Sequence, residues 1–224
     1  SAPDYENPSD EDTDNVYSLI VDATDGFNTT QQSIDVTVTN ISDSAPTFTS
    51  SGSFTVAENE TAIGTVAATD VDGDTVSFSL SGTDEDSLQI DSSSGLLTFK
   101  TAPDYETKSL YNATVAASDG TYTSAQTISI TITNVNEFTP TFSSASSFTV
   151  AENQTDGPTV EATDGDGETI TYSITGGADA SSLEINSSTG VLTFKTAPDY
   201  ETKSTYQLTV RASDGTNNGA QDIT

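Results

Sequence analysis

The chain of 224 residues contains no cysteine, no histidine and no tryptophan. Without cysteine it can form neither a disulfide framework nor a catalytic thiolate. Without tryptophan it lacks the buried indole found in antibody domains, and it lacks the aromatic platform on which sugars stack best. A chain without disulfides has to gain its stability from a hydrophobic core or from bound metal.

Basic residues are almost as scarce. Lysine and arginine number 5 against 35 acidic residues, so the formal net charge is −30, and no base precedes Lys100. Phosphate backbones and anionic lipids are bound by clusters of lysine and arginine. The composition therefore argues against nucleic acid and membrane surfaces as partners, and it favours cations.

Long hydrophobic runs are absent as well. No apolar run approaches the roughly 18 residues that a membrane-spanning helix needs, and the first residues show no signal-peptide pattern. We therefore expect no membrane insertion in this segment, and we expect it to be a slice of a longer protein. Acidic chains can be disordered, but here the acids lie between runs in which apolar and polar residues alternate. That alternation indicates β-strands.

Two stretches of the sequence occur twice, which indicates tandem repeats. Residues 98–109 are identical to residues 193–204, and residues 53–59 are identical to residues 147–153, so one repeat is about 94 residues long. We predict three parts, which are the C-terminal part of a repeat at 1–45, a complete repeat at 46–139, and a repeat lacking most of its last strand at 140–224.

The complete repeat alternates with period 2, which predicts short strands separated by turn residues. These strands are expected at residues 54–56, 65–69, 76–80, 88–90, 96–99, 111–117 and 128–132. The hairpin between two of them places Gly95 where a positive φ is expected. Such a series of short strands is typical of an antiparallel Greek-key sandwich. We therefore predict an all-β fold of tandem, immunoglobulin-like β-sandwich domains.

Acidic residues recur at the same positions of each repeat and should gather at the ends of each sandwich. Glu58 and residues 104–106 are expected at one end, and residues 70–74 with Asp119 at the other. Stacked repeats would bring these ends together around a linker such as residues 134–140. Calcium takes six to eight oxygen ligands, whereas bare carboxylates a few ångströms apart repel by roughly 1 kcal/mol per pair. The pattern thus predicts calcium at the junctions.

The order of these motifs resembles a known family. Ala-Glu-Asn, then Asp-x-Asp, then Asp-Tyr-Glu, then Ala-x-Asp, then an Asn- and Asp-rich linker closing on proline resembles the cadherin repeat. The resemblance is strongest to the cadherin-like repeats of bacterial (RTX-type) calcium-dependent surface adhesins, and it covers the whole chain. It implies cadherin-like sandwiches with two to three Ca²⁺ ions at each interdomain junction, in an extracellular or cell-surface protein.

The resemblance also implies a ligand set for each junction. For the first junction these residues are Asp4, Glu6, Asn40, Ser42, Asp43, Ser44, Asp70, Asp72 and Asp119, with Ser42 and Ser44 acting through their carbonyls. For the central junction they are Glu58, Asp104, Glu106, Asn134, Asn136, Glu137, Phe138, Asp164, Asp166 and Asp214, with Asn136 and Phe138 acting through their carbonyls. For the C-terminal junction they are Glu152, Asp199 and Glu201.

Two enzymatic or metal-site alternatives fit the sequence less well. Residues 70–74 resemble the start of an EF-hand loop, but Thr75 stands where that loop needs glycine and no flanking helices are predicted. Asp104 and Glu106 could be the carboxylate pair of a glycosidase, but neither a cleft-forming insertion nor a histidine accompanies them. We therefore expect no enzyme. Tyr105 and Tyr200, between the paired acids, either pack under their loops or face a ligand.

The predicted function is structural. We expect calcium-rigidified extender repeats of a secreted or cell-surface adhesin, such as those of bacterial biofilms, holding a distal binding domain away from the cell. The expected partners are calcium ions and the adjacent repeats of the same chain. Two alternatives remain open: the repeats themselves bind like repeats or polysaccharide in cell adhesion, or they build a head-to-tail extracellular filament.

Overall fold

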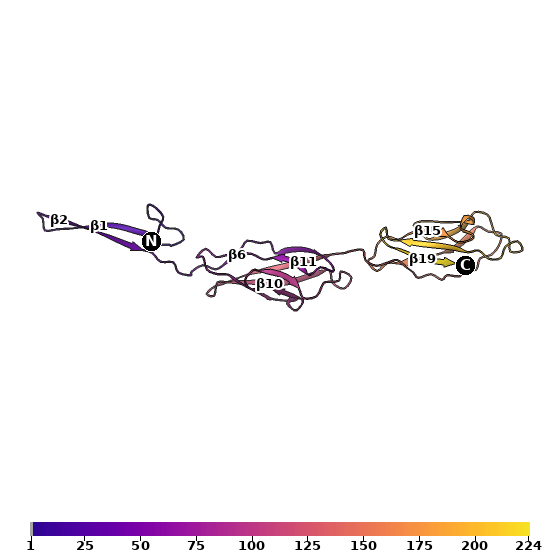
Figure 1. The fold of residues 1–224 in the computed structure, drawn as a ribbon, viewed down its shortest axis with the longest axis horizontal. Coiled ribbons are helices and arrows are strands. Elements are labelled where there is room, and N and C mark those ends of the chain that lie inside the picture. Colours follow the sequence, from indigo (N-terminus) through magenta and orange to yellow (C-terminus); the bar gives the residue numbers. More distant parts are fainter. Residues whose placement is uncertain (1) are drawn as a thin grey trace. The chain divides into compact units, whose positions relative to one another are not determined.

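A computed structural model describes residues 2–224, so Ser1 of the predicted partial repeat lies outside the described residues. The chain divides into two compact units, Ser1–Thr133 and Asn134–Thr224. Among the described residues the only helical segments are two 3₁₀ turns, and all other regular structure is β-strand (Figure 1). The prediction of an all-β fold is confirmed.

Most of the strands are short, and β12–β19 of the second unit correspond in order to β3 and β5–β11 of the first. The first unit contains β1 Val16–Thr24, β2 Thr29–Thr37, β3 Thr47–Phe48, β4 Ser53–Ala57, β5 Ala62–Thr65, β6 Ala68–Thr69, β7 Ser77–Ser81, the 3₁₀ turn η1 Glu85–Ser87, β8 Leu88–Ile90, β9 Leu96–Phe99, β10 Leu110–Ser118 and β11 Thr123–Thr133. The second contains β12 Thr141–Phe142, β13 Asp156–Thr159, β14 Ala162–Thr163, β15 Thr171–Gly176, η2 Ala180–Ser182, β16 Leu183–Ile185, β17 Val191–Phe194, β18 Leu208–Ser213 and β19 Asn218–Ile223.

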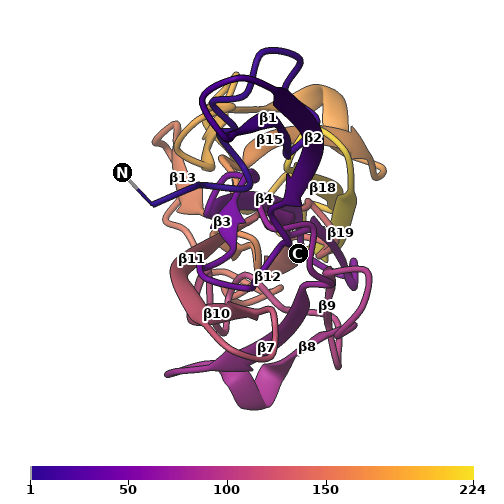
Figure 2. The same ribbon diagram turned by 90° about the vertical axis from the view of Figure 1, so that its left-hand side faces the viewer.

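The first unit begins with an isolated hairpin. β1 and β2 pair antiparallel from Val16↔Thr37 to Thr24↔Thr29, and they form a two-stranded sheet of their own (Figure 2). The segment before the hairpin, residues 7–15, holds no regular structure.

The rest of the first unit is a sandwich. Its larger sheet has the order β4-β11-β10-β7, and β5-β9-β8 forms the second, with β3-β6 as a short extra pair. The alternation in β11 explains the packing, because Ile128, Ile130 and Ile132 all point to one face and are at most 1% exposed. Val115 of β10 and Leu97 of β9 complete this core at 0% exposure. Buried β-branched residues pack well against a pleated surface.

The sandwich is not purely antiparallel, which corrects the predicted topology. β4 runs parallel to β11, with Ser53 opposite Ser129 and Ala57 opposite Thr133. Parallel pairing requires a long connection between the two strands, and here almost the whole repeat lies between them. A pattern of short strands read along the chain cannot reveal the pairing of its first strand with its last.

The strand predicted at residues 65–69 is also wrong in part. β5 ends at Thr65 and β6 begins at Ala68, and the two belong to different sheets. Val66 N–H donates to the Gly95 carbonyl (2.9 Å), whereas the Ala67 carbonyl accepts from Thr49 N–H (2.8 Å). The chain therefore crosses from one sheet to the other inside a run that the sequence shows as continuous.

The second unit repeats this arrangement around its own core, but among the described residues it has no strand corresponding to β4. Its sheets are β15-β18-β19, β13-β17-β16 and β12-β14. Val160 and Val210 are 0% exposed and Leu192 is 1% exposed. β19 spans 6 residues where β11 spans 11.

The hairpin turn at residues 91–95 is the one that the sequence predicted best. Asp91 Oδ1 accepts the N–H groups of Ser94 (2.8 Å) and Ser93 (3.0 Å), and these bonds, with those from the two serine hydroxyls, hold the pKa of Asp91 well below its ordinary value. Gly95 has φ +70°, and a Cβ there would lie 2.0 Å from the Val66 carbonyl oxygen. Only glycine fits this position.

Candidate metal centre

The first candidate site is organised around Asp72, which is 7% exposed. Its Oδ2 accepts the backbone N–H groups of Ser44 (2.9 Å) and Asp43 (3.1 Å), and its carbonyl accepts from Asn40 Nδ2 (2.6 Å). Asp70 Oδ1 in turn accepts the N–H of Asp72 (3.0 Å). The acidic turn and the linker at residues 40–44 are thereby tied together by one buried carboxylate.

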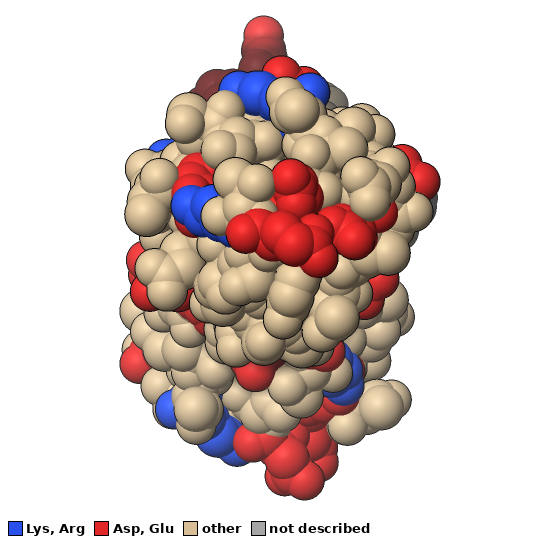
Figure 3. Space-filling model, turned by 90° about the vertical axis from the view of Figure 1, so that its right-hand side faces the viewer, with Lys and Arg blue, Asp and Glu red and all other residues tan. Residues whose placement is uncertain are grey.

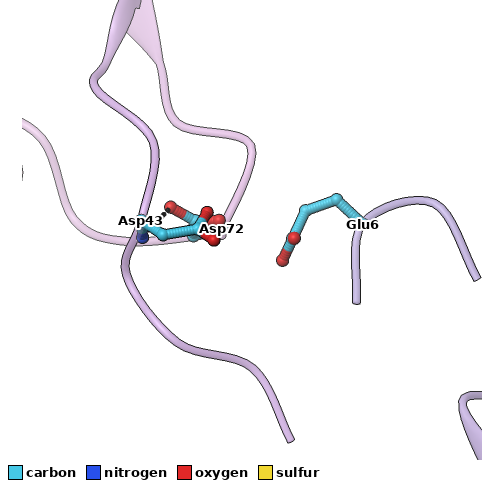
Figure 4. Close-up of side chains that lie close together, drawn as sticks. All are labelled: Glu6, Asp43 and Asp72. Atoms are coloured by element: carbon cyan, nitrogen blue, oxygen red, sulfur yellow. Dashed lines mark hydrogen bonds between the residues drawn. The ribbon is translucent and has the colours of Figure 1, made fainter. Parts of the chain in front are cut away.

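Three carboxylates face one another at this place. Glu6, Asp43 and Asp72 each offer an oxygen, and these oxygens lie within 4.8 Å of one another (Figure 4). Asp4 Oδ1 orients the Glu6 loop by accepting the N–H of Glu6 (3.1 Å). Burial, and then the charges of Asp72, Asp43 and Asp4, raise the pKa of Glu6 above its ordinary value. Like charges gathered without a cation disfavour the ionised form.

Several buried oxygens at this end find no hydrogen-bond donor within the described chain. They are Glu6 Oε1, Ser42 Oγ, Asp70 Oδ2, Asp72 Oδ1 and Asp119 Oδ2. A buried polar atom without a partner is costly, and a set made only of oxygens is what a hard divalent cation requires. This set of oxygen atoms therefore fits calcium as its ligands, and the fit comes from the geometry of the chain itself.

The second unit contains the same arrangement around Asp166, which is 8% exposed. Its Oδ2 accepts the N–H groups of Phe138 (2.7 Å) and Glu137 (2.8 Å), and its carbonyl accepts from Asn134 Nδ2 (2.9 Å). Asp164 Oδ1 accepts the N–H of Asp166 (3.0 Å). The two buried aspartates thus hold the two linkers in the same way.

Glu168 belongs to this site although the sequence did not single it out. At this end of the second unit, Asp164, Asp166, Glu168 and Asp214 each have a buried oxygen that finds no hydrogen-bond donor among the described residues. Burial, and then Asp164 and Asp166, raise the pKa of Glu168. Its counterpart Asp74 has an oxygen within 4.8 Å of those of Asp70 and Asp72. The overlooked signal was the third acid of Asp-x-Asp-x-Asp/Glu.

Asn217 is a second residue that the sequence did not indicate. Its Nδ2 donates to Asn136 Oδ1 (2.6 Å) and to the Phe138 carbonyl (2.8 Å). Asp214 Oδ1 accepts the N–H groups of Asn217 and Thr216, both at 2.6 Å. Burial opposes ionisation of Asp214, but these donors outweigh it and lower the pKa. Asn217 therefore connects the linker to the aspartate that follows β18.

The opposite end of each sandwich carries the paired acids. Glu58 is 1% exposed, and its Oε2 accepts the N–H of Tyr105 (2.8 Å), while Asp104 Oδ1 accepts the N–H of Thr107 (2.9 Å). In the second unit Glu152 Oε2 accepts the N–H of Tyr200 in the same way (2.9 Å). Tyr105 is 37% and Tyr200 is 67% exposed, so neither ring is buried under its loop.

The predicted ligands are thus brought together to different degrees. Glu6, Asp43 and Asp72 meet in the first unit, and oxygens of Glu152, Asp199 and Glu201 lie within 4.8 Å of one another in the second. Acidic side chains also gather visibly on the face shown in Figure 3. Of the residues predicted for the central junction, Glu58, Asp104 and Glu106 belong to the first unit and the others belong to the second. The hydrogen bonds within each unit are those given above. Calcium ligation by these residues stays a prediction.

One further acidic group lies in the loop at residues 7–15, before β1. Asp10, Asp12 and Asp14 have oxygens within 4.8 Å of one another. Asp10 Oδ2 accepts the N–H of Asp14 (3.1 Å), and Asp14 Oδ1 accepts the N–H of Val16 (2.8 Å). Such side-chain to backbone bonds are ordinary in aspartate turns, and we assign no metal to this loop.

Repeated β-sandwiches whose acidic turns hold an Asn-containing linker define a class, that of tandem sandwich proteins with acidic ends. The particular family follows from direct comparison. The model of the cadherin domain matches residues 52–133 and 146–224. The chain belongs to the cadherin domain family, whose domains bind Ca²⁺ at interdomain junctions.

Curated relatives are animal cadherins of much greater length. The chain is 36% identical to human Protocadherin Fat 4 over 221 residues, covering 91% of this chain and 4% of that protein. It is 31% identical to human Protocadherin Fat 1 over 235 residues, covering 96% of this chain and 5% of that protein. The chain therefore spans about one twentieth of the length of these relatives.

Solved structures agree on the fold. Protocadherin gamma B2 extracellular cadherin domains 3–6 match with a TM-score of 0.78 at 20% identity, covering 97% of this chain and 61% of that one. Mouse cadherin-23 EC22–24 matches with a TM-score of 0.70 at 25% identity, covering 97% and 76%. The predicted sandwich and the extracellular location are confirmed.

The bacterial affiliation is not supported, because the relatives named here are animal protocadherins. Within residues 2–224, no helix has the length and apolar character needed to cross a bilayer.

Proposed function

We propose that this chain is a run of cadherin repeats in an extracellular adhesion protein, and that Ca²⁺ held at its interdomain junctions fixes neighbouring repeats relative to one another. The observation that carries the proposal is the set of buried oxygens that lack a donor around Asp72 and Asp166. We propose repeat boundaries at residues 45/46 and 139/140, as the sequence indicates.

The ligands of each junction would come from two repeats and the linker between them. Calcium would neutralise carboxylates that otherwise repel, and it would bridge chain segments by sharing their oxygens. We propose the ligand sets given by the resemblance, extended by Glu168 at the central junction and by Asp74 at the first. Two to three ions per junction are consistent with this number of carboxylates. Affinities on the order of 10⁻⁴ to 10⁻³ M are typical of extracellular calcium modules.

Two uses of a stiffened array are compatible with these sites. The first is an extender that holds a distal binding domain away from the cell. The second is adhesion by the repeats themselves, through contacts with like repeats. The family match favours the second, and one similar structure is described as a cis-dimer of protocadherin gamma B7 EC3–6. Sedimentation of the chain in calcium distinguishes the two, since an extender stays monomeric at concentrations where an adhesive repeat self-associates.

Small-angle scattering with and without EGTA tests the proposed function. In 5 mM CaCl₂ we expect a larger maximum dimension and a narrower distance distribution than in EGTA, because unneutralised junctions bend freely. The matched control is the same comparison for the Asp72→Asn/Asp166→Asn double variant, in which calcium should change the profile little. A wild-type profile identical in calcium and EGTA would contradict the proposal.

A further inference from the structure

Each unit contains a buried aspartate that lies outside the candidate metal sites. Asp84, just before η1, is 8% exposed, and Asp179, just before η2, is 7% exposed. Asp84 Oδ2 accepts the N–H of Asn112 (2.8 Å), and Oδ1 forms an ion pair with Lys108. A buried charge is tolerated only when it is paired and hydrogen-bonded, and both conditions are met here.

The lysine partner is attached to the loop that carries the paired acids. Lys108 follows Glu106 by two positions, and its own N–H donates to the Asp104 carbonyl (2.9 Å). Its ammonium lies 4.7 Å from the centre of the Tyr111 ring, within cation–π range. The residue is therefore bonded to the acidic loop through its backbone and to the body of the sandwich through its side chain.

The second unit repeats every one of these contacts. Asp179 forms an ion pair with Lys203 and accepts the N–H of Gln207 (2.8 Å). Lys203 N–H donates to the Asp199 carbonyl (2.8 Å), and its ammonium lies 5.0 Å from the Tyr206 ring centre. A chain with 5 basic residues in 224 thus places two of them at equivalent positions of its two sandwiches.

The charge of these lysines is unfavourable for a cation-binding loop. An ammonium so close in sequence to Asp104 and Glu106 repels a divalent cation, so attraction of calcium does not explain its place. Fixation of the loop does. A loop that is ordered before its ligand arrives binds more tightly, because the ligand no longer has to order it.

We propose that the Asp84–Lys108 and Asp179–Lys203 pairs are positioning elements that hold the Asp104–Glu106 and Asp199–Glu201 loops in their calcium-binding conformation before calcium arrives. The inference rests on the proposed function and concerns residues that do not touch the ion. The first loop differs, since Tyr5 is held there by Asn15, whose Nδ2 donates to the Tyr5 carbonyl (3.0 Å). The first junction therefore serves as an internal control.

The test is the Lys108→Met variant of the whole chain. Methionine keeps an unbranched apolar stem against Tyr111 but removes the ion pair. Calcium is titrated at 25 °C and followed by NMR at the amides of Thr107 and Ser44, which report the two junctions separately. We expect affinity at Thr107 to fall about tenfold, in the range found when groups that orient metal ligands are removed, while affinity at Ser44 stays unchanged.

The controls separate positioning from charge and from folding. Lys100→Met removes the same charge from a lysine that bonds the Asp86 carbonyl (3.0 Å), and it should leave affinity at Thr107 unchanged or slightly higher. Lys108→Arg keeps a positive charge opposite Asp84, so this variant should bind calcium with the wild-type affinity. If Lys108→Met fails to fold, the Asp84→Asn/Lys108→Met double variant leaves no unpaired buried carboxylate, and it should show the same tenfold loss.

The outcomes are distinct. Unchanged or increased affinity at Thr107 in a folded variant would overturn the positioning role, because charge removal alone predicts an increase. A fall at both Thr107 and Ser44 would overturn it too, since it would show a general loss of structure. A wild-type chain that binds no calcium at either probe would instead refute the proposed function.

Discussion

The Asp72→Asn variant is expected to lose calcium binding at the first junction, with affinity lower by about 100-fold. Asp72 Oδ2 accepts two linker N–H groups, and Oδ1 is buried without a donor beside Glu6 and Asp43. An asparagine has one oxygen for these two tasks. Its NH₂ group must face either the linker amides or the cation. Hydrogen bonds to a charged group contribute about 1.5–3 kcal/mol, and about 1.4 kcal/mol is a factor of ten in affinity.

Calorimetric titration of calcium into the variant measures this loss. The matched control is Asp22→Asn, which makes the same charge change on an exposed residue of β1 away from the acidic turn. The control should bind calcium like the wild type, which would exclude a simple effect of net charge. Wild-type stoichiometry and affinity in Asp72→Asn would show that this carboxylate is not a ligand.

Chelation of calcium should lower the melting temperature of the wild-type chain by on the order of 10 °C. A ligand at 100 times its Kd stabilises the folded state by about 2.7 kcal/mol, and each 1 kcal/mol shifts the melting temperature of a domain of 60–100 residues by roughly 4–8 °C. The −30 chain also loses the neutralisation of its clustered carboxylates. Two effects of the same sign therefore add.

Differential scanning calorimetry in 10 mM CaCl₂ and in EGTA measures the shift. The control replaces CaCl₂ by NaCl at equal ionic strength, because salt alone screens exposed charges. NaCl should recover only a small part of the shift. Equal melting temperatures in CaCl₂ and NaCl would mean that screening explains the stabilisation and that no specific site is involved.

Local patterns in the sequence predicted much of this fold. The alternation at Ile128, Ile130 and Ile132 placed a buried strand correctly, and Gly95 marked the hairpin turn at residues 91–95. Both features depend on neighbouring residues only. Glu58 recurs as Glu152 one predicted repeat later, and both glutamates accept an N–H from the tyrosine between the paired acids.

Features that depend on residues distant in sequence were missed. The parallel pairing of β4 with β11 joins segments separated by most of a repeat. The ion pair of Asp84 with Lys108 and the bonds of Asn217 to residues 136 and 138 also span long separations. Periodicity carries no information on such contacts, because it reports which face of a strand is buried and not what covers it.

The affiliation was misjudged for a chemical reason. The motifs that carried the resemblance consist of carboxylates, amides and a linker proline, and these residue types follow from the needs of a calcium site. Bacterial and animal cadherin repeats share those needs. Overall similarity along the chain, by contrast, is to animal protocadherins, with 36% identity to human Protocadherin Fat 4 over 221 residues.

Anomalous difference density from a crystal grown in calcium is the most direct test of the central claim. The account predicts strong peaks about 2.3–2.6 Å from carboxylate oxygens, the distance of calcium ligands. One peak should lie among Glu6, Asp43 and Asp72, and another beside Asp164, Asp166 and Glu168. Density consistent only with water at both places, in saturating calcium, would contradict it.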